Sequence, residues 1–185
     1  MLTHDEERYI LENAYIPEHI VSLMTILSKG EPFLAEEYVY YVKDDAAIVI
    51  GYPLNGEFSL NHFDRFVKTL MKSLSCDYLR MAAPKLPDIY LKDALDKSSD
   101  EYFILPLEGF SVKSSLKREI QSALKTVTTE RTKIFEESHS MLIDEMIKRV
   151  KPNERIRKLY LSMPDYISKS NTVLVLDAKD SRGRL

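Results

Sequence analysis

The chain has 185 residues, of which 44% are hydrophobic and 30% are charged, and its formal net charge is −3. These proportions are ordinary for a soluble globular chain of one domain or one and a half. The single cysteine, Cys76, excludes a disulfide framework and a cysteine-based zinc site. No apolar stretch near the start is long enough to span a bilayer, and the acidic residues after Met1 exclude a secretory leader, so we expect a cytosolic protein.

The two parts of the chain differ in charge. Residues 1–112 hold 10 Lys/Arg against 19 Asp/Glu, a net charge of −9, and residues 113–185 hold 16 against 10, a net charge of +6. This asymmetry indicates two structural units, or one unit with a polar partner surface. Chance and solvated helix faces explain it equally well.

The first elements change from a helical to a strand period. Apolar spacing predicts helical segments over residues 5–28, with Pro17 in the first turn of the second segment. A hairpin follows, and Asp44 and Asp45 form its turn. Next come an amphipathic helix capped by Asn61 and a further strand. The three predicted strands cover residues 37–43, 46–52 and 77–83.

Helices and strands then alternate to the end of the chain. A short helix begins at Pro87, and the apolar run from Glu101 to Leu107 predicts a strand. The helices predicted after it cover residues 111–126, 138–150 and 152–163, with a helical turn at 165–168. The last strands cover residues 131–136 and 172–178.

This order predicts an α/β (α+β) fold, with a mixed, largely antiparallel sheet flanked by helices. We place the boundary between two domains at residues 127 and 128, so that the first covers 1–127 and the second 128–185. The second ends soon after a strand and the turn Asp180–Gly183, with only Arg184 and Leu185 to begin a return strand. We therefore expect an incomplete second domain whose last strand has an unsatisfied edge.

The order of elements from Thr132 to Leu185 resembles the opening of the Gcn5-related acyltransferase fold. That fold begins with a strand, two helices, a strand, a turn and a strand, as in Asn171–Leu185 and the elements before it. The first part is similar to the N-terminal half of tandem acyltransferase-like proteins of the FemAB and lysyl-phosphatidylglycerol synthase type. The basic helix Lys113–Lys125 is similar to the helix that joins their two domains. The resemblance implies an acyl-CoA N-acyltransferase-like fold with a partial second copy.

The resemblance also implies where coenzyme A would bind. The family holds the pyrophosphate in a glycine-rich loop at a helix N-terminus. The five glycines here lie too far apart to build that loop. We therefore expect no cofactor in this chain, although acyl-CoA or aminoacyl-tRNA would serve a full-length protein.

The sequence contains few groups suited to catalysis. Its four histidines, His4, His19, His62 and His139, lack metal-ligand spacing, and each is expected at the surface or in a cap. The acidic neighbour of Cys76 disfavours the thiolate, so this residue is expected to be structural. No catalytic residue and no metal site can be named.

The candidate binding residues are six cations around Pro152, with one carboxylate among them. They suit the phosphates of RNA or of anionic lipid headgroups, or else form a solvated helix face. This basic helix bend consists of Lys148, Arg149, Lys151, Arg155, Arg157 and Lys158. The predicted hairpin also carries tyrosines, of which Tyr38 and Tyr40 share one face and Tyr41 the other, for packing or for an interface.

We therefore expect the N-terminal part of an acyl- or aminoacyl-transferase-like protein that is not catalytically complete by itself. The alternative is a non-catalytic binding or assembly domain that engages a protein or a phosphate-bearing partner. In either case the terminal strand would pair with a second copy, as a homodimer, or with a missing C-terminal domain.

Overall fold

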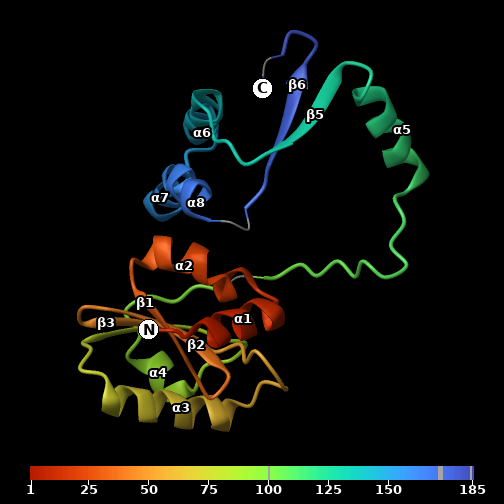
Figure 1. Cartoon of the computed structure of the whole chain (residues 1–185). Helices are drawn as coiled ribbons and strands as arrows, with labels where there is room; N and C mark the ends of the chain where they lie inside the picture. The colour runs from red at the N-terminus through yellow and green to blue at the C-terminus, as the bar shows by residue number, and fades with distance from the viewer. Residues whose placement is uncertain (100, 171–172, 184) are drawn as a thin grey trace. The chain divides into compact units, whose positions relative to one another are not determined.

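The computed structural model describes residues 1–99, 101–170, 173–183 and 185, and it forms two compact units, Met1–Glu101 and Tyr102–Leu185 (Figure 1). The two units meet at residues 101 and 102, whereas the two acyltransferase-like domains expected to meet after residue 127 stay a prediction. The helix α5 (Ser114–Ala123) consequently belongs to the C-terminal unit.

The N-terminal unit begins with the predicted helical segments. The first helix, α1 (His4–Asn13), starts at Thr3, whose hydroxyl accepts from the Glu6 N–H in a capping box. The 3₁₀ turn η1 (Pro17–His19) and helix α2 (Val21–Ser28) follow. The second helix ends because Lys29 takes a left-handed conformation with φ of 55°.

The four-stranded sheet of this unit has the order β1-β2-β3-β4. Its strands are β1 (Glu31–Ala35), β2 (Tyr38–Lys43), β3 (Ala46–Ile50) and β4 (Tyr78–Ala82). The first three are antiparallel neighbours, whereas β4 runs parallel to β3. The predicted hairpin is confirmed, and so is a mixed, mostly antiparallel sheet.

The parallel pair requires a crossover, which is supplied by α3 (Leu60–Ser73). This helix begins at Ser59, whose hydroxyl accepts from the His62 N–H, and not at Asn61 as predicted. The short helix α4 (Asp88–Lys92) follows Pro87, as expected.

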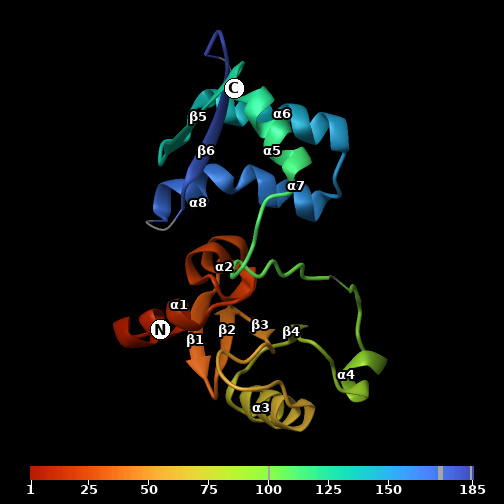
Figure 2. The same cartoon turned by 90° about the vertical axis from the view of Figure 1, so that its right-hand side faces the viewer.

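Helices cover both faces of the sheet (Figure 2). Strand residues alternate between the two faces, so Tyr38 packs with the side chains of α3 whereas Tyr41 belongs to a cluster with side chains of α1 and α2. One cluster contains Ile10, Ile16, Val39, Tyr41, Ile50 and Leu54, and the other contains Tyr38, Val49, Phe63, Phe66, Val67 and Leu70. The two clusters lie on opposite faces of the sheet, so the core of this unit has three layers: helices, sheet and helices.

The C-terminal unit pairs its two strands, β5 (Val127–Thr132) and β6 (Val175–Asp180), in an antiparallel ladder. Between them lie α6 (Glu137–Val150), α7 (Glu154–Leu161) and α8 (Met163–Lys169). The predicted turn after the last strand is confirmed, with the Gly183 N–H donating to the Asp180 carbonyl at 2.9 Å.

Several predictions about the C-terminal unit are wrong. Residues 101–107 form no strand and are exposed, because no neighbouring strand pairs with them in the described chain. The strand β5 begins at Val127, earlier than predicted, and β6 ends at Asp180, later than predicted. The first residue of the last predicted strand, residue 172, lies outside the described residues. The strand β6 pairs with β5 along one edge, and in the described chain no strand pairs with its other edge, where an unsatisfied edge was predicted.

Burial differs sharply between the two units. Every buried apolar side chain of the described chain lies between Ile10 and Leu70. The C-terminal unit instead exposes many large apolar side chains, including Phe103, Ile104, Leu107, Leu116, Ile120, Leu124 and Leu176. Within the part of the chain that is described, no helix is long and apolar enough to cross a membrane.

Candidate functional site

The predicted basic helix bend lies where α6 ends and α7 begins. Lys148 and Arg149 occupy the last turn of α6, and Lys151 ends this helix with φ of 49°. Cations at the C-terminal end of a helix are stabilised by the negative end of the helix dipole. Arg157 and Lys158 lie on α7, while the side chain of Arg155 lies outside the described residues.

Most cations of this bend remain available to a ligand. Arg157 pairs with Glu154 at 3.6 Å, the expected i,i+3 contact on an exposed helix. Lys148, Arg149, Lys151 and Lys158 are exposed and form no ion pair with the side chains that the structure describes. The bend is therefore an exposed cationic surface, not an enclosed site.

A buried His–Asp pair joins α6 to β6. His139 Nε2 lies 2.9 Å from an Asp177 carboxylate oxygen, and both side chains are almost fully buried. His139 Nδ1 accepts from the Glu136 N–H at 2.8 Å, within the cap of α6. Because Nδ1 is an acceptor, the proton lies on Nε2 and points to Asp177.

Groups of the protein engage both ring nitrogens of His139, so the pair links the cap of α6 to β6. Lys179 extends the network, with its Nζ 2.7 Å from a Glu130 oxygen and 3.9 Å from Asp177. The bond to Glu130 raises the pKa of Lys179. The sequence predicted His139 at the surface or in a cap, and the structure places it in the cap of α6 with its side chain buried. Its partner Asp177 lies 38 residues away and carries no local signal.

His19 is fully buried under the sheet of the N-terminal unit. Its Nε2 lies 2.9 Å from the Tyr52 carbonyl oxygen, to which it donates, and its Nδ1 faces the Tyr15 N–H at 3.5 Å. The Tyr15 ring packs edge-on against the imidazole at 4.9 Å. Burial lowers the pKa of His19, which favours the neutral imidazole. This buried position differs from the surface or cap position predicted for the histidines.

Lowering the pH is expected to destabilise the N-terminal unit through His19. Its pKa is lower in the folded state than the ordinary value of about 6.5, so the unfolded chain binds the proton more readily. This contribution to stability is complete above that value and is lost as the pH falls below it, by at most about 1.4 kcal/mol per pH unit. The free energy of unfolding of the N-terminal unit, from native-state hydrogen exchange of β2 and β3 at about pH 7.5 and about pH 5.5, measures the loss, which should be smaller in His19→Gln. An equal loss in both proteins would contradict this assignment.

His62 is also engaged in hydrogen bonds. Its Nε2 lies 3.0 Å from a Glu36 oxygen, and its Nδ1 lies 3.3 Å from the Tyr38 hydroxyl. Glu36 and its neighbour Glu37 turn the chain from β1 to β2 with φ of 48° and 73°. The Tyr9 hydroxyl donates to the Glu37 carboxylate, so side chains hold both residues of this strained turn. The described chain contains no group of His, Cys, Asp and Glu that could hold a metal ion.

The tyrosines of the hairpin serve packing. Tyr38 and Tyr41 are fully buried, and burial raises the pKa of both phenols. The Phe33 and Tyr40 rings stack across β1 and β2 at 5.3 Å. Near α4, the Tyr90 hydroxyl donates to Asp64 at 3.2 Å, and burial together with this bond raises the pKa of Tyr90 to about 12.

The feature that sequence reasoning missed is uncovered apolar surface. On β6, Asp177 faces α6, so its neighbours Leu176 and Ala178 face away from that helix and are exposed. Leu176 is 71% exposed. The apolar run of the last strand predicts a buried element, whereas among the described residues Leu174 and Leu176 are exposed.

Comparison with known proteins identifies no relative: no family model, no curated protein and no solved structure matches the chain.

Proposed function

We propose that this chain is a non-catalytic binding or assembly part, and that its C-terminal unit is the part that engages a partner. The observation that carries the proposal is the large apolar surface that this unit leaves exposed. Exposed apolar patches of this kind mark sites of protein or membrane interaction. A two-stranded sheet is also marginally stable in isolation, so a partner that adds to it would stabilise it.

The engaged histidines support a non-catalytic role. A general base needs a free lone pair within reach of its substrate. His19, His62 and His139 each place both ring nitrogens within reach of groups of the protein itself. Among the described side chains, these three histidines therefore supply no free base.

We propose further that the full-length protein is acyl- or aminoacyl-transferase-like, with this chain as its N-terminal part. The order of elements in the C-terminal unit agrees with the opening order expected from the resemblance to Gcn5-related acyltransferases. That order is a strand (β5), two helical segments (α6, then α7 with α8), a second strand (β6) and a turn. Catalysis in a complete protein would hold two substrates together and stabilise the tetrahedral oxyanion. The edge of β6 that β5 does not occupy would then pair with a further domain or with a second copy.

Calorimetry with acetyl-coenzyme A tests the non-catalytic role. We expect no binding heat with this chain, because no glycine-rich phosphate loop is present. A coenzyme A-dependent acyltransferase titrated in the same buffer is the positive control. Saturable binding in the micromolar range would contradict the proposal.

A second candidate function is phosphate binding at the basic helix bend, favoured by its exposed cations. Replacing Lys148, Lys151 and Lys158 with alanine should weaken binding to tRNA and lower the slope of log affinity against log salt by about 2, at about 0.7 for each lost contact. Filter binding over a range of salt concentrations measures both effects.

The matched control replaces Lys72, Lys92 and Lys97 of the N-terminal unit, which removes the same charge. If both triple variants lost the same tRNA affinity, net charge alone would explain the effect. That result would contradict a binding site at the bend.

A further inference from the structure

The C-terminal unit begins with an extended apolar segment, residues 102–110, in which every side chain is exposed. Phe103 is 94% exposed, Ile104 is 88% exposed and Leu107 is 78% exposed. A turn closes the segment, with the Phe110 N–H donating to the Leu107 carbonyl at 3.2 Å. Water disfavours such a run of large apolar side chains, so the working protein must have something to cover it.

The helix that follows has the same property. Leu116, Ile120 and Leu124 recur every four residues, which places them on one stripe, and they are 47%, 45% and 55% exposed. Every residue of α5 is exposed, and the helix has only 10 residues. An isolated helix of this length is marginal in water, so α5 needs a surface against its apolar stripe.

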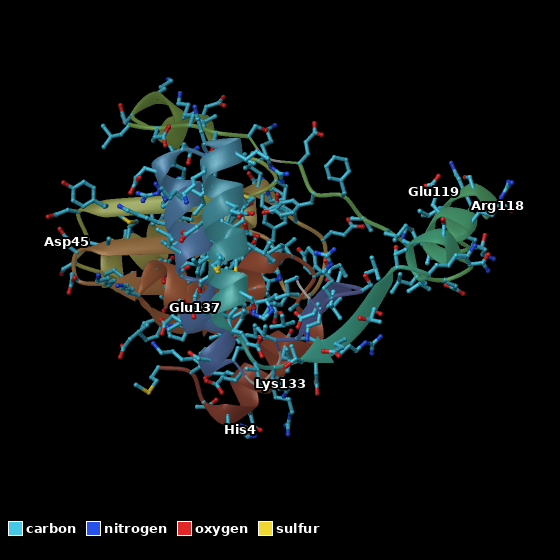
Figure 3. All side chains as sticks on the ribbon, turned by 90° about the horizontal axis from the view of Figure 1, so that it is seen from above. His4, Asp45, Arg118, Glu119, Lys133 and Glu137 are labelled. Atoms are coloured by element: carbon cyan, nitrogen blue, oxygen red, sulfur yellow. The ribbon has the colours of Figure 1, made fainter. Side chains whose placement is uncertain are left out.

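The charges around the stripe indicate what this surface is. Lys113, Lys117, Arg118 and Lys125 accompany the apolar residues, against only two carboxylates, Glu108 and Glu119. The helical positions place Lys117 beside the stripe and Arg118 on the opposite side. Figure 3 labels Arg118 and Glu119, whose side chains project outward from α5.

We propose that residues 102–125 form a membrane-interface segment that binds an anionic lipid surface. The aromatic and aliphatic side chains would enter the boundary between headgroups and acyl chains, with α5 lying in the plane of the interface. The long Lys117 side chain would reach from the edge of the stripe to the lipid phosphates, and the remaining cations would add long-range attraction. This inference rests on the proposed function, because it names the partner of the exposed surface.

Vesicle flotation tests the inference directly. The full chain should float with vesicles of phosphatidylcholine mixed with phosphatidylglycerol, and far less with phosphatidylcholine alone. Salt should weaken the binding. The double variants Leu116→Glu/Ile120→Glu and Lys117→Glu/Arg118→Glu should each lose about tenfold or more in affinity.

The matched control is Ile89→Glu/Leu95→Glu in the N-terminal unit, whose side chains are 59% and 94% exposed. It introduces the same charge and should leave vesicle binding unchanged. The chain has no tryptophan, so a single introduced tryptophan gives a second readout of vesicle binding. The fluorescence of Phe103→Trp should shift to shorter wavelength with mixed vesicles only.

Three outcomes overturn the inference. The first is that the chain floats with neither kind of vesicle. The second is that the control variant Ile89→Glu/Leu95→Glu loses as much vesicle affinity as Leu116→Glu/Ile120→Glu does. The third is a concentration-dependent dimer, seen in sedimentation equilibrium, that Leu116→Glu/Ile120→Glu abolishes, because a second copy would then cover the stripe. Acetyl-coenzyme A binding would instead overturn the proposed function, so the two failures are distinguishable.

Discussion

Replacing Phe63 with alanine is expected to lower the free energy of unfolding of the N-terminal unit by about 3–5 kcal/mol. The Phe63 ring is fully buried between the sheet and α3. It packs edge-on against Tyr38 at 5.4 Å and lies 6.0 Å from the Phe58 ring. Alanine removes these contacts and leaves a cavity that close packing around it cannot fill.

The change should be measured for each unit separately, because a chain of two units does not unfold in one step. Native-state hydrogen exchange of peptides from β2 and β3 reports on the N-terminal unit alone. Phe103→Ala is the matched control, since the same substitution at a side chain 94% exposed should change stability by less than about 0.5 kcal/mol. Similar effects of the two substitutions would contradict the placement of the core.

Replacing Gly51 with alanine is expected to destabilise the same unit by about 1–3 kcal/mol. A Cβ atom at this position would lie 2.6 Å from the Ala83 Cβ and 2.6 Å from the Phe63 Cζ. Gly51 follows β3, and its N–H donates to the Ala82 carbonyl at 2.7 Å. The backbone is therefore fixed against β4, and the added methyl group can be accommodated only by moving the core.

Gly56→Ala separates this packing effect from backbone preference. Gly56 has φ of +80° and open space around its missing side chain, so only the conformational cost of about 1 kcal/mol applies. Exchange in β3 and β4 measures both variants. A larger effect at Gly56 than at Gly51 would contradict the close approach of β3, β4 and α3.

The N-terminal unit was largely predictable, because its local signals agree with its tertiary contacts. Alternation along β2 correctly placed Tyr38 and Tyr41 on opposite faces, and the amphipathic helix predicted after the hairpin is α3, which buries Phe63. The strand β1 is not among the predicted strands, and it contains Pro32. An edge strand tolerates proline, since one of its edges has no hydrogen-bond partner to lose.

The C-terminal unit was less predictable, because apolar sequence indicates burial without specifying the partner. Residues 101–107 have the composition of a buried strand, and the apolar stripe of α5 predicts an inward face, yet both are exposed. The sequence cluster of the basic helix bend lies where α6 ends and α7 begins, and its role in phosphate binding stays a prediction. The pairing of His139 with Asp177 could not be predicted, because a contact between distant residues leaves no periodic signal.

Hydrogen–deuterium exchange along the whole chain tests the central claim most directly. That claim is a closed N-terminal core joined to a C-terminal unit with uncovered apolar surface. It predicts that amides of β2 and β3 exchange more slowly than those of residues 102–113 by about 1,000-fold or more. Comparable protection in the two segments, with the chain monomeric and without any partner, would contradict the claim.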